Sequence, residues 1–122
     1  MSFAFARYAE ARAETTSPAQ LVVALYDAAL RSLRGAQISI AERDYAKKGA
    51  QLSRAHEIVT ELRVTLDETR APALCAELTR LYDYVRQQIT EANLHADAAP
   101  LAGAILVLER LRGAWATVAG TP

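Results

Sequence analysis

The chain has 122 residues, a length that predicts one domain able to bury a hydrophobic core without disulfide or metal support. Its 14 basic and 14 acidic residues cancel, which argues against the basic surface that nucleic acid or an anionic membrane would select. The single cysteine, Cys75, rules out an internal disulfide and is typical of a reducing compartment. No stretch has the pattern of a secretory leader or the length of a membrane span, so we expect a cytoplasmic protein without membrane insertion.

The first 16 residues are predicted to be an N-terminal arm, with or without loose helical structure. Phe3, Phe5 and Tyr8 stand there among alanines and charged residues. Two interpretations stay open. In the first, the arm docks reversibly in an apolar groove of the following helices. Burying two phenylalanines recovers part of the cost of ordering some ten residues, and helix hydrogen bonds and other contacts bring the balance near zero. In the second, the arm is a fixed part of the helical domain.

A helix is predicted over residues 18–41. Ser17 is a good N-cap, Pro18 suits the first helical position, and Gln20 completes a capping box. Apolar residues then recur at intervals of three and four, which indicates one buried helical face. The positions of that face are Val22, Leu25, Tyr26, Ala29, Leu33, Ala36 and Ile40.

Two further helices are predicted after short breaks. Asp44 can cap a helix that runs to about Leu66, and Gly49 within it indicates a close helix crossing. Pro72 is placed to begin the next helix, which reaches about Leu94. The predicted buried faces are Tyr45, Leu52, Ala55, Val59, Leu62 and Leu66 in the first, and Leu74, Leu78, Leu81, Tyr82, Val85, Ile89 and Ala92 in the second.

The last predicted helix is capped by Asp97, has Pro100 in its first turn and ends near Val118. Its apolar face comprises Leu101, Ala104, Leu108, Leu111, Trp115 and Val118. Four helices of similar length joined by short turns must reverse direction at each turn and bury their apolar faces against a common axis. The predicted fold is therefore an all-α, antiparallel four-helix bundle over residues 17–119, preceded by the arm.

No catalytic or cofactor-binding pattern is present, so neither an enzyme nor a bound metal or cofactor is expected. Glu91 and His95 have a metal-like spacing, but the paired carboxylates and histidines of a di-iron bundle are missing. Cys75 falls on the packed face of its helix and is predicted to be a buried, inert thiol. The charged pairs, Asp27 with Arg31 and Glu57 with Glu61, are predicted to face solvent.

The chain carries more apolar residues than the four buried faces need. On a helical projection Val23, Leu30, Ile58, Tyr84 and Val107 lie on the flanks of those faces, and Leu94 and Leu106 point nearly opposite the core. For any one residue, a wider buried face is a slightly better explanation than an exposed groove. Together they indicate exposed grooves between helices that could hold an amphipathic segment of another protein.

Several short motifs occur along the chain in a distinctive order and spacing. They are Tyr8, Ser17-Pro18 with Leu21, Leu25-Tyr26-Asp27, the run from Ala55 to Leu62, Leu81-Tyr82-Asp83-Tyr84, Glu91-Ala92-Asn93-Leu94 and Leu108 to Trp115. Over about residues 8 to 118 these motifs resemble the FliS family of flagellar export chaperones. The family tends to carry a carboxylate where this chain has the small residues of 101–105, and it is more basic around 86–88.

This resemblance implies a cytoplasmic type III export chaperone that binds the disordered C-terminal segment of flagellin, blocks premature polymerisation and assists export, without a cofactor. Export-gate and regulatory proteins are further expected partners, and the chain itself is expected to be a monomer or a weak homodimer. Asn93 has two equal interpretations: it bonds a client backbone, or it bonds the free carbonyls of its own helix. The predicted client-binding residues are Tyr8, Val23, Leu30, Ile58, Tyr84, Asn93, Leu94, Leu106 and Val107.

Two other classes of function compete with this one. A self-associating helical adaptor would use the same surplus apolar faces against a second copy of the chain. An all-helical enzyme such as a mutase would need several inward arginines and glutamates, and none of the four predicted buried faces has such a cluster.

Overall fold

The computed structural model describes residues 17–120 and consists there of four helices joined by short turns. They are α2 (Pro18–Ala41), α3 (Tyr45–Val64), α4 (Pro72–His95) and α5 (Ala99–Ala119). These bounds confirm the four helices expected from the apolar spacing, to within two residues at most ends. The predicted N-terminal arm lies outside the described residues, and so does the question of whether it acts as a lid.

The helices begin and end where local side chains satisfy their free backbone groups. Ser17 and Gln20 form the predicted capping box: the Ser17 Oγ accepts from the Gln20 N–H at 3.2 Å, and the Gln20 Oε1 accepts from the Ser17 N–H at 2.9 Å. Asp44 caps α3 by accepting from the Lys47 N–H. The predicted N-cap of α5 is wrong by one residue, because the N-cap is Ala98 and not Asp97. The Asp97 carboxylate still accepts from the N–H of Ala99, the first residue of the helix.

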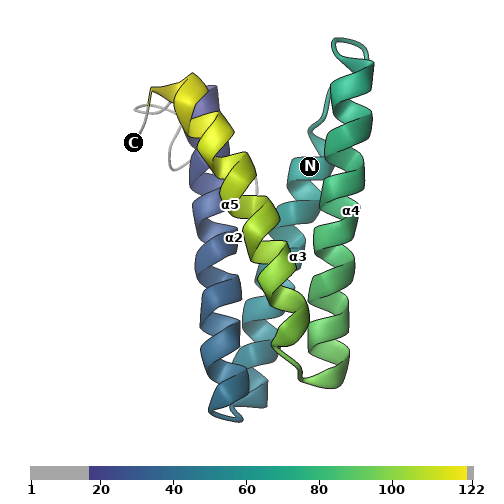
Figure 1. Ribbon diagram of the computed structural model, residues 1–122. Coiled ribbons are helices and arrows are strands. Elements are labelled where there is room, and N and C mark those ends of the chain that lie inside the picture. The colour runs from purple at the N-terminus through teal and green to yellow at the C-terminus, as the bar shows by residue number, and fades with distance from the viewer. Residues whose placement is uncertain (1–16, 121–122) are drawn as a thin grey trace.

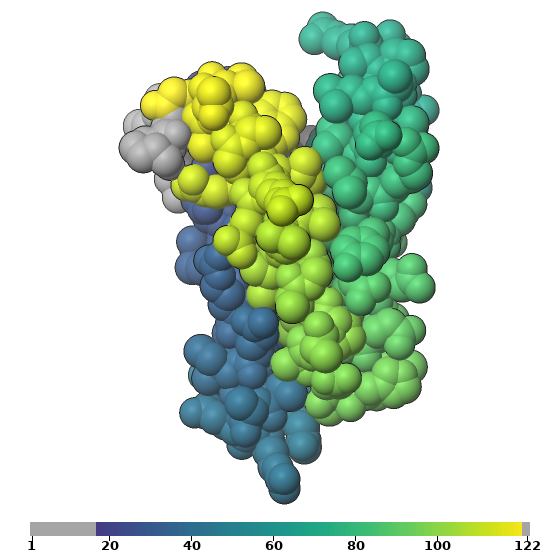
Figure 2. Space-filling model, in the orientation of Figure 1, coloured from purple at the N-terminus to yellow at the C-terminus, as the bar shows by residue number. Residues whose placement is uncertain are grey.

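Successive helices run in opposite directions and pack in a ring, in which α2 and α4 each contact both α3 and α5 (Figure 1). The predicted all-α bundle is confirmed. Helix α5 lies obliquely across the face between α2 and α4, and the surface is hollowed between its C-terminal end and the N-terminal half of α4 (Figure 2). Of the described helices, none combines the length and apolarity needed to cross a lipid bilayer.

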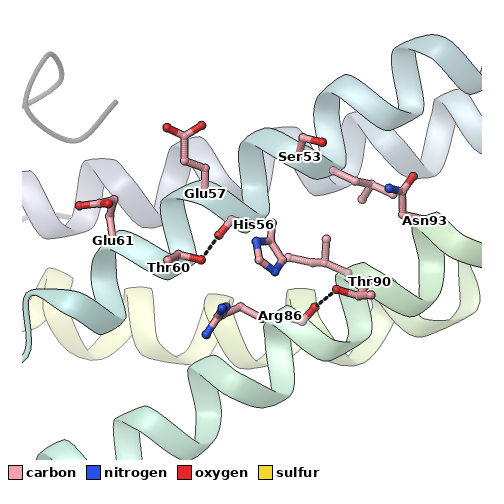
Figure 3. Close-up of a pocket in the computed structure, with 10 residues that line it drawn as sticks. Ser53, His56, Glu57, Thr60, Glu61, Arg86, Thr90 and Asn93 are labelled. Carbon is pink, nitrogen blue, oxygen red and sulfur yellow. Dashed lines mark hydrogen bonds between the residues drawn. The ribbon is translucent and has the colours of Figure 1, made fainter. Parts of the chain in front are cut away.

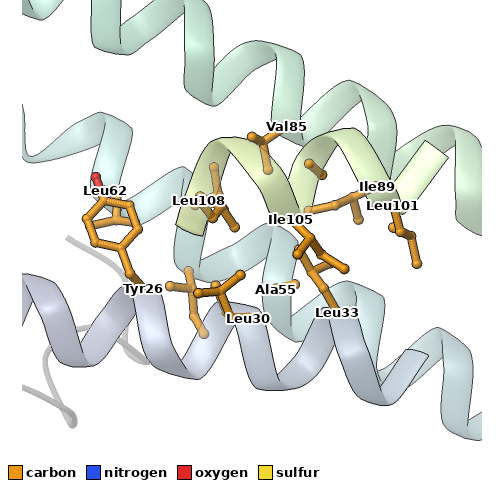
Figure 4. Close-up of a cluster of buried hydrophobic side chains, with 14 of the residues drawn as sticks. Tyr26, Leu30, Leu33, Ala55, Leu62, Val85, Ile89, Leu101, Ile105 and Leu108 are labelled. Carbon is orange, nitrogen blue, oxygen red and sulfur yellow. The ribbon is translucent and has the colours of Figure 1, made fainter. Parts of the chain in front are cut away.

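The core is built from the apolar faces of all four helices (Figure 4). Tyr26 of α2 and Tyr82 of α4 meet inside it, and their hydroxyl groups share a hydrogen bond. Burial raises the pKa of both phenols, so both stay protonated and each can serve the other as donor or acceptor. Cys75 is buried, as predicted, and its thiol donates to the Asp67 carbonyl oxygen.

The buried faces predicted from the sequence are wrong mainly at helix ends. Tyr45, Leu74 and Val118 are exposed, because the first and last turns of a helix have fewer neighbours to cover them. The close crossing expected at Gly49 is also wrong, since a Cβ built there would meet no atom within 4 Å. In the first turn of α3 there is also an error of the opposite kind: Lys48, which was not predicted to be buried, is buried on the face that carries Leu52, Ala55, Val59 and Leu62.

Candidate functional site

Helices α3 and α4 enclose a groove of about 480 Å³, which we call the α3–α4 groove. Leu52 and Ile89 give it an apolar floor. In Figure 3, His56 reaches from α3 towards α4, whereas Glu57 points away from α4. The walls are polar and comprise Ser53, His56, Glu57, Thr60, Glu61, Arg86, Thr90 and Asn93.

Two threonines on opposite walls use their hydroxyl protons on their own helices. The Thr60 Oγ1 donates to the His56 carbonyl oxygen at 2.8 Å, and the Thr90 Oγ1 donates to the Arg86 carbonyl oxygen at 3.0 Å. Their oxygen lone pairs remain able to accept from a bound molecule. Burial, with a smaller contribution from the charge of Arg86, lowers the pKa of His56, so its imidazole is neutral at pH 7.

Glu61 and Arg86 place two unsatisfied polar atoms at one end of this groove. Glu61 is only 5% exposed, and its Oε2 has no hydrogen-bond partner; the buried Nε of Arg86 has none either. The guanidinium of Arg86 is tethered through its Nη1 to Asp83, which also accepts from Arg63 of α3 at 2.8 Å. The prediction that Glu61 faces solvent is wrong, because residue 61 lies on the side of α3 that also carries the buried Ile58.

Lys48 and Asn93 join the two helices at the other end of the groove. The Lys48 Nζ donates to both the side-chain Oδ1 of Asn93, at 2.9 Å, and its backbone oxygen, at 3.1 Å. The bond satisfies a carbonyl in the last turn of α4, where a cation is also favoured by the helix dipole. The side-chain and backbone oxygens of Asn93 thus both accept from Lys48 of the neighbouring helix, and the role of Asn93 towards a client stays a prediction. Sequence reasoning missed Lys48, although its spacing from Leu52 and Ala55 placed it on the buried face.

A second candidate surface lies on the α4–α5 face. Tyr84 of α4 is 40% exposed and lies across α5 at Gly103, where a Cβ would collide with the phenol oxygen. Leu106 is 50% exposed, and Val107 is half-buried against the core one turn beyond Gly103. The small residues of 101–105 thus make room for an aromatic side chain from the neighbouring helix.

The other predicted client-binding residues are not gathered at one place. Val23, Leu30 and Ile58 are buried, so the expectation that they line exposed grooves is wrong. Leu30 and Ile58 belong to the hydrophobic core that the four helices share. Leu94 is largely exposed near the C-terminal end of α4, about 15 Å along that helix from Tyr84. Tyr8 lies outside the described residues.

A second hollow of about 480 Å³ lies between α2 and α3, and no sequence pattern indicated it. Arg31 and Arg54 line it, together with Gln51, whose side-chain oxygen accepts from the Ser39 hydroxyl at 2.7 Å. Gln51 also fills the space beside Gly35.

Within residues 17–120, no three histidine, cysteine or acidic side chains come together in a way that could hold a metal ion. Glu91 and His95 form only an exposed pair on α4, with 3.4 Å between the Oε2 and Nε2 atoms. Both grooves are thus suited to non-covalent binding by hydrogen bonds and apolar contact.

Comparison with known proteins identifies the family. The model of the family described as "Flagellar protein FliS" matches residues 1–122. A Salmonella typhimurium protein named "Flagellar secretion chaperone FliS" is 31% identical over 107 residues, covering 87% of this chain and 79% of that protein. The protein of the same name from Bacillus subtilis is 30% identical over 111 residues (91% and 82%), and "Flagellar secretion chaperone FliSB" of Pseudomonas aeruginosa is 28% identical over 106 residues (87% and 84%). The chain belongs to the FliS family of flagellar proteins.

Proposed function

We propose that this protein is a cytoplasmic secretion chaperone of the flagellar export system and that its client is the disordered C-terminal segment of flagellin. The observation that carries the proposal is family membership over the whole chain, together with relatives named as flagellar secretion chaperones. The proposal also names the client and the segment of the client that is bound. These two details rest on the resemblance of the sequence motifs and on the candidate binding surfaces described above.

The surfaces support a client that is a polypeptide. Tyr84 and Leu106 expose apolar area on the α4–α5 face, and the α3–α4 groove combines an apolar floor with hydrogen-bonding walls. Such surfaces bind segments that bury apolar side chains and carry unsatisfied polar groups. We therefore retain Tyr84, Asn93, Leu94, Leu106 and Val107 as proposed client contacts, and Tyr8 with them. The buried Val23, Leu30 and Ile58 are assigned to the core instead.

Binding alone accounts for the proposed activity. A chaperone that covers the C-terminal segment of flagellin prevents that segment from packing against other flagellin molecules, and so prevents premature filament growth in the cytoplasm. Handing the covered client to the export gate requires release, which coupled folding and binding favours because ordering the client offsets part of the interaction energy. No step calls for a cofactor.

Titration calorimetry with monomeric flagellin tests this proposal. We expect tight binding with a large negative heat-capacity change, since apolar surface is buried as the client orders. Flagellin truncated before its C-terminal segment is expected to give no heat of binding above dilution. Equal heats with both proteins would contradict the proposed client segment.

A self-associating helical adaptor remains the second candidate, because Leu94, Leu106 and Tyr84 could equally contact a second copy of the chain. Light scattering separates the two candidates. A chaperone should be monomeric, or at most a weak dimer, when flagellin is absent. A stable oligomer that is dispersed by Leu106→Asp, and that binds no flagellin, would favour the adaptor.

A further inference from the structure

Arg31 of α2 and Arg54 of α3 differ from most arginines of the bundle, because neither forms an ion pair within residues 17–120. Both residues are exposed, and both line the hollow of about 480 Å³ between these helices, which we call the α2–α3 hollow. Asp27 lies one turn before Arg31, but its carboxylate is held by Arg112 of α5 at 2.8 Å. The arginines that do pair with a carboxylate are Arg34, Arg63, Arg70, Arg80, Arg86 and Arg112. Two guanidinium groups on neighbouring helices thus share one hollow without a carboxylate to neutralise them.

The rest of the lining of the α2–α3 hollow also offers hydrogen-bond donors. The Oε1 of Gln51 accepts from the Ser39 hydroxyl at 2.7 Å, and the amide N–H groups of Gln51 remain as donors. Ser32 adds a hydroxyl group that can donate. The other two lining residues are Ala28 and Ala50, so among the described residues no carboxylate lines the hollow. This hollow therefore selects a ligand that is negatively charged and accepts several hydrogen bonds.

We propose that the α2–α3 hollow binds an acidic segment of a partner protein, with one carboxylate at Arg31 and a second at Arg54. Phosphate sites draw on the free backbone N–H groups of a helix N-terminus or a tight turn. The residues of this hollow lie inside α2 and α3, where the backbone N–H groups are bonded within the helix. Guanidinium groups carried by two different helices suit separate carboxylates, because one carboxylate can accept two parallel bonds from one arginine.

The length of the hollow fits a partner helix. The hollow follows about one turn of each helix, over residues 28–32 and 50–54, which is roughly 6 Å. Carboxylates three or four residues apart on a helix have about this separation. The seam between α2 and α3 lies diagonally opposite the α4–α5 face, because α2 and α4 each contact both α3 and α5. The site is therefore separate from the proposed client contacts Tyr84 and Leu106, and the inference does not depend on the client.

A fluorescein-labelled, alanine-based helical peptide with glutamates four residues apart is a suitable probe. Fluorescence anisotropy with the full chain at about 20 mM salt measures its dissociation constant. We expect saturable binding that weakens as salt is added, because exposed charges are screened. A peptide with glutamine in place of every glutamate should not bind.

Three double variants test which arginines hold the probe. Arg31→Gln with Arg54→Gln should weaken binding about tenfold or more, because both guanidinium–carboxylate contacts are lost. Arg31→Lys with Arg54→Lys keeps the charge but loses the paired bonds, so binding should weaken by about threefold. The matched control is Arg43→Gln with Arg110→Gln, which removes two arginines that likewise form no ion pair within the described residues but lie outside the hollow. The control should bind within about twofold of the wild type, and none of these exposed changes should alter the melting temperature appreciably.

Three outcomes would overturn the inference. The first is no saturable binding by the wild type. The second is an equal loss of affinity in the two glutamine variants, which would mean attraction to positive charge anywhere on the surface. The third concerns competition: glutarate, which has two carboxylates, should displace the probe at a lower concentration than inorganic phosphate at equal ionic strength, and the reverse order would mean a phosphate site. The assay contains no flagellin, so none of these outcomes bears on the proposed function.

Discussion

The α2–α5 and α3–α4 seams belong to the same bundle but are packed differently. Between α2 and α5, apolar side chains fill the interior and charged pairs stay near the rim, as in the contact of Arg112 Nε with Asp27 at 2.8 Å. Between α3 and α4, longer polar side chains enter the seam itself and leave a groove in which Glu61 and Arg86 are not fully satisfied. The α2–α5 seam is therefore closed by apolar packing, whereas the α3–α4 seam stays partly open.

The largest expected effect on stability comes from placing a charge at a buried apolar residue. The sequence pattern had grouped this residue with exposed ones. Ile58→Asp places a carboxylate in the packed interior and should lower the free energy of unfolding by roughly 4 kcal/mol or more. Tyr84→Asp, on the exposed α4–α5 face, should lower it by about 1 kcal/mol or less while weakening client binding. Urea unfolding followed by circular dichroism measures both; equal losses would mean that Tyr84 also belongs to the core.

The next largest loss of stability is expected from shortening a side chain in the buried core. Leu33 is fully buried, and Leu33→Ala should cost about 2–5 kcal/mol through lost apolar burial and the cavity left behind. Leu106→Ala removes the same atoms from a half-exposed position and should cost about 1 kcal/mol or less. Chemical denaturation of the two variants makes the comparison, and a small cost at Leu33 would show that the interior collapses to fill the space.

A double-mutant cycle can test the contact between Tyr84 and Gly103. Gly103→Ala improves helix propensity by about 1 kcal/mol but forces the phenol away, so in the wild-type background it should change stability little. In a Tyr84→Phe background the collision with the hydroxyl oxygen is gone, and the same change should stabilise by about 0.5–1 kcal/mol. Thermal melts of the four proteins measure the coupling free energy between positions 84 and 103. If the effects of the two changes on stability are strictly additive, the Tyr84 ring moves aside at no cost.

The smallest expected effect is a pH dependence that originates in the groove. Burial and Arg86 hold the folded-state pKa of His56 below its ordinary value of 6.5, so the unfolded chain takes up the proton first. Stability should therefore be complete above about pH 6.5 and decline as the pH falls from there through the lowered folded-state pKa. His56→Gln should flatten that decline in the melting temperature. A wild-type profile retained by His56→Gln would place the effect elsewhere.

The local signals in the sequence predicted the helices well because they depend on neighbouring residues. The capping box at Ser17 and Gln20, and the spacing of Leu25, Leu33 and Ala36, are satisfied within one helix and need no knowledge of the others. The motifs of 81–84 and 91–94 also led to the family, which the comparison confirms.

The candidate sites were predicted less well, because exposure depends on which neighbour covers a given side of a helix. A projection placed Val23, Leu30 and Ile58 on flanks, but it could not show that an adjacent helix lies close enough to bury them. It also treated charged residues as solvated, so it left out Lys48 and Glu61, which are buried on α3.

The sequence by itself determined where the helices begin and end, which fold class they form and to which family the chain belongs, since periodicity, caps and motif order are properties of the linear chain. Only the tertiary structure decided which seam is closed and which is open. That outcome depends on the reach of Lys48 to Asn93 between α3 and α4, and on the burial of the Glu61 Oε2 and the Arg86 Nε without partners. These are distances between segments far apart along the chain, and no local pattern specifies them.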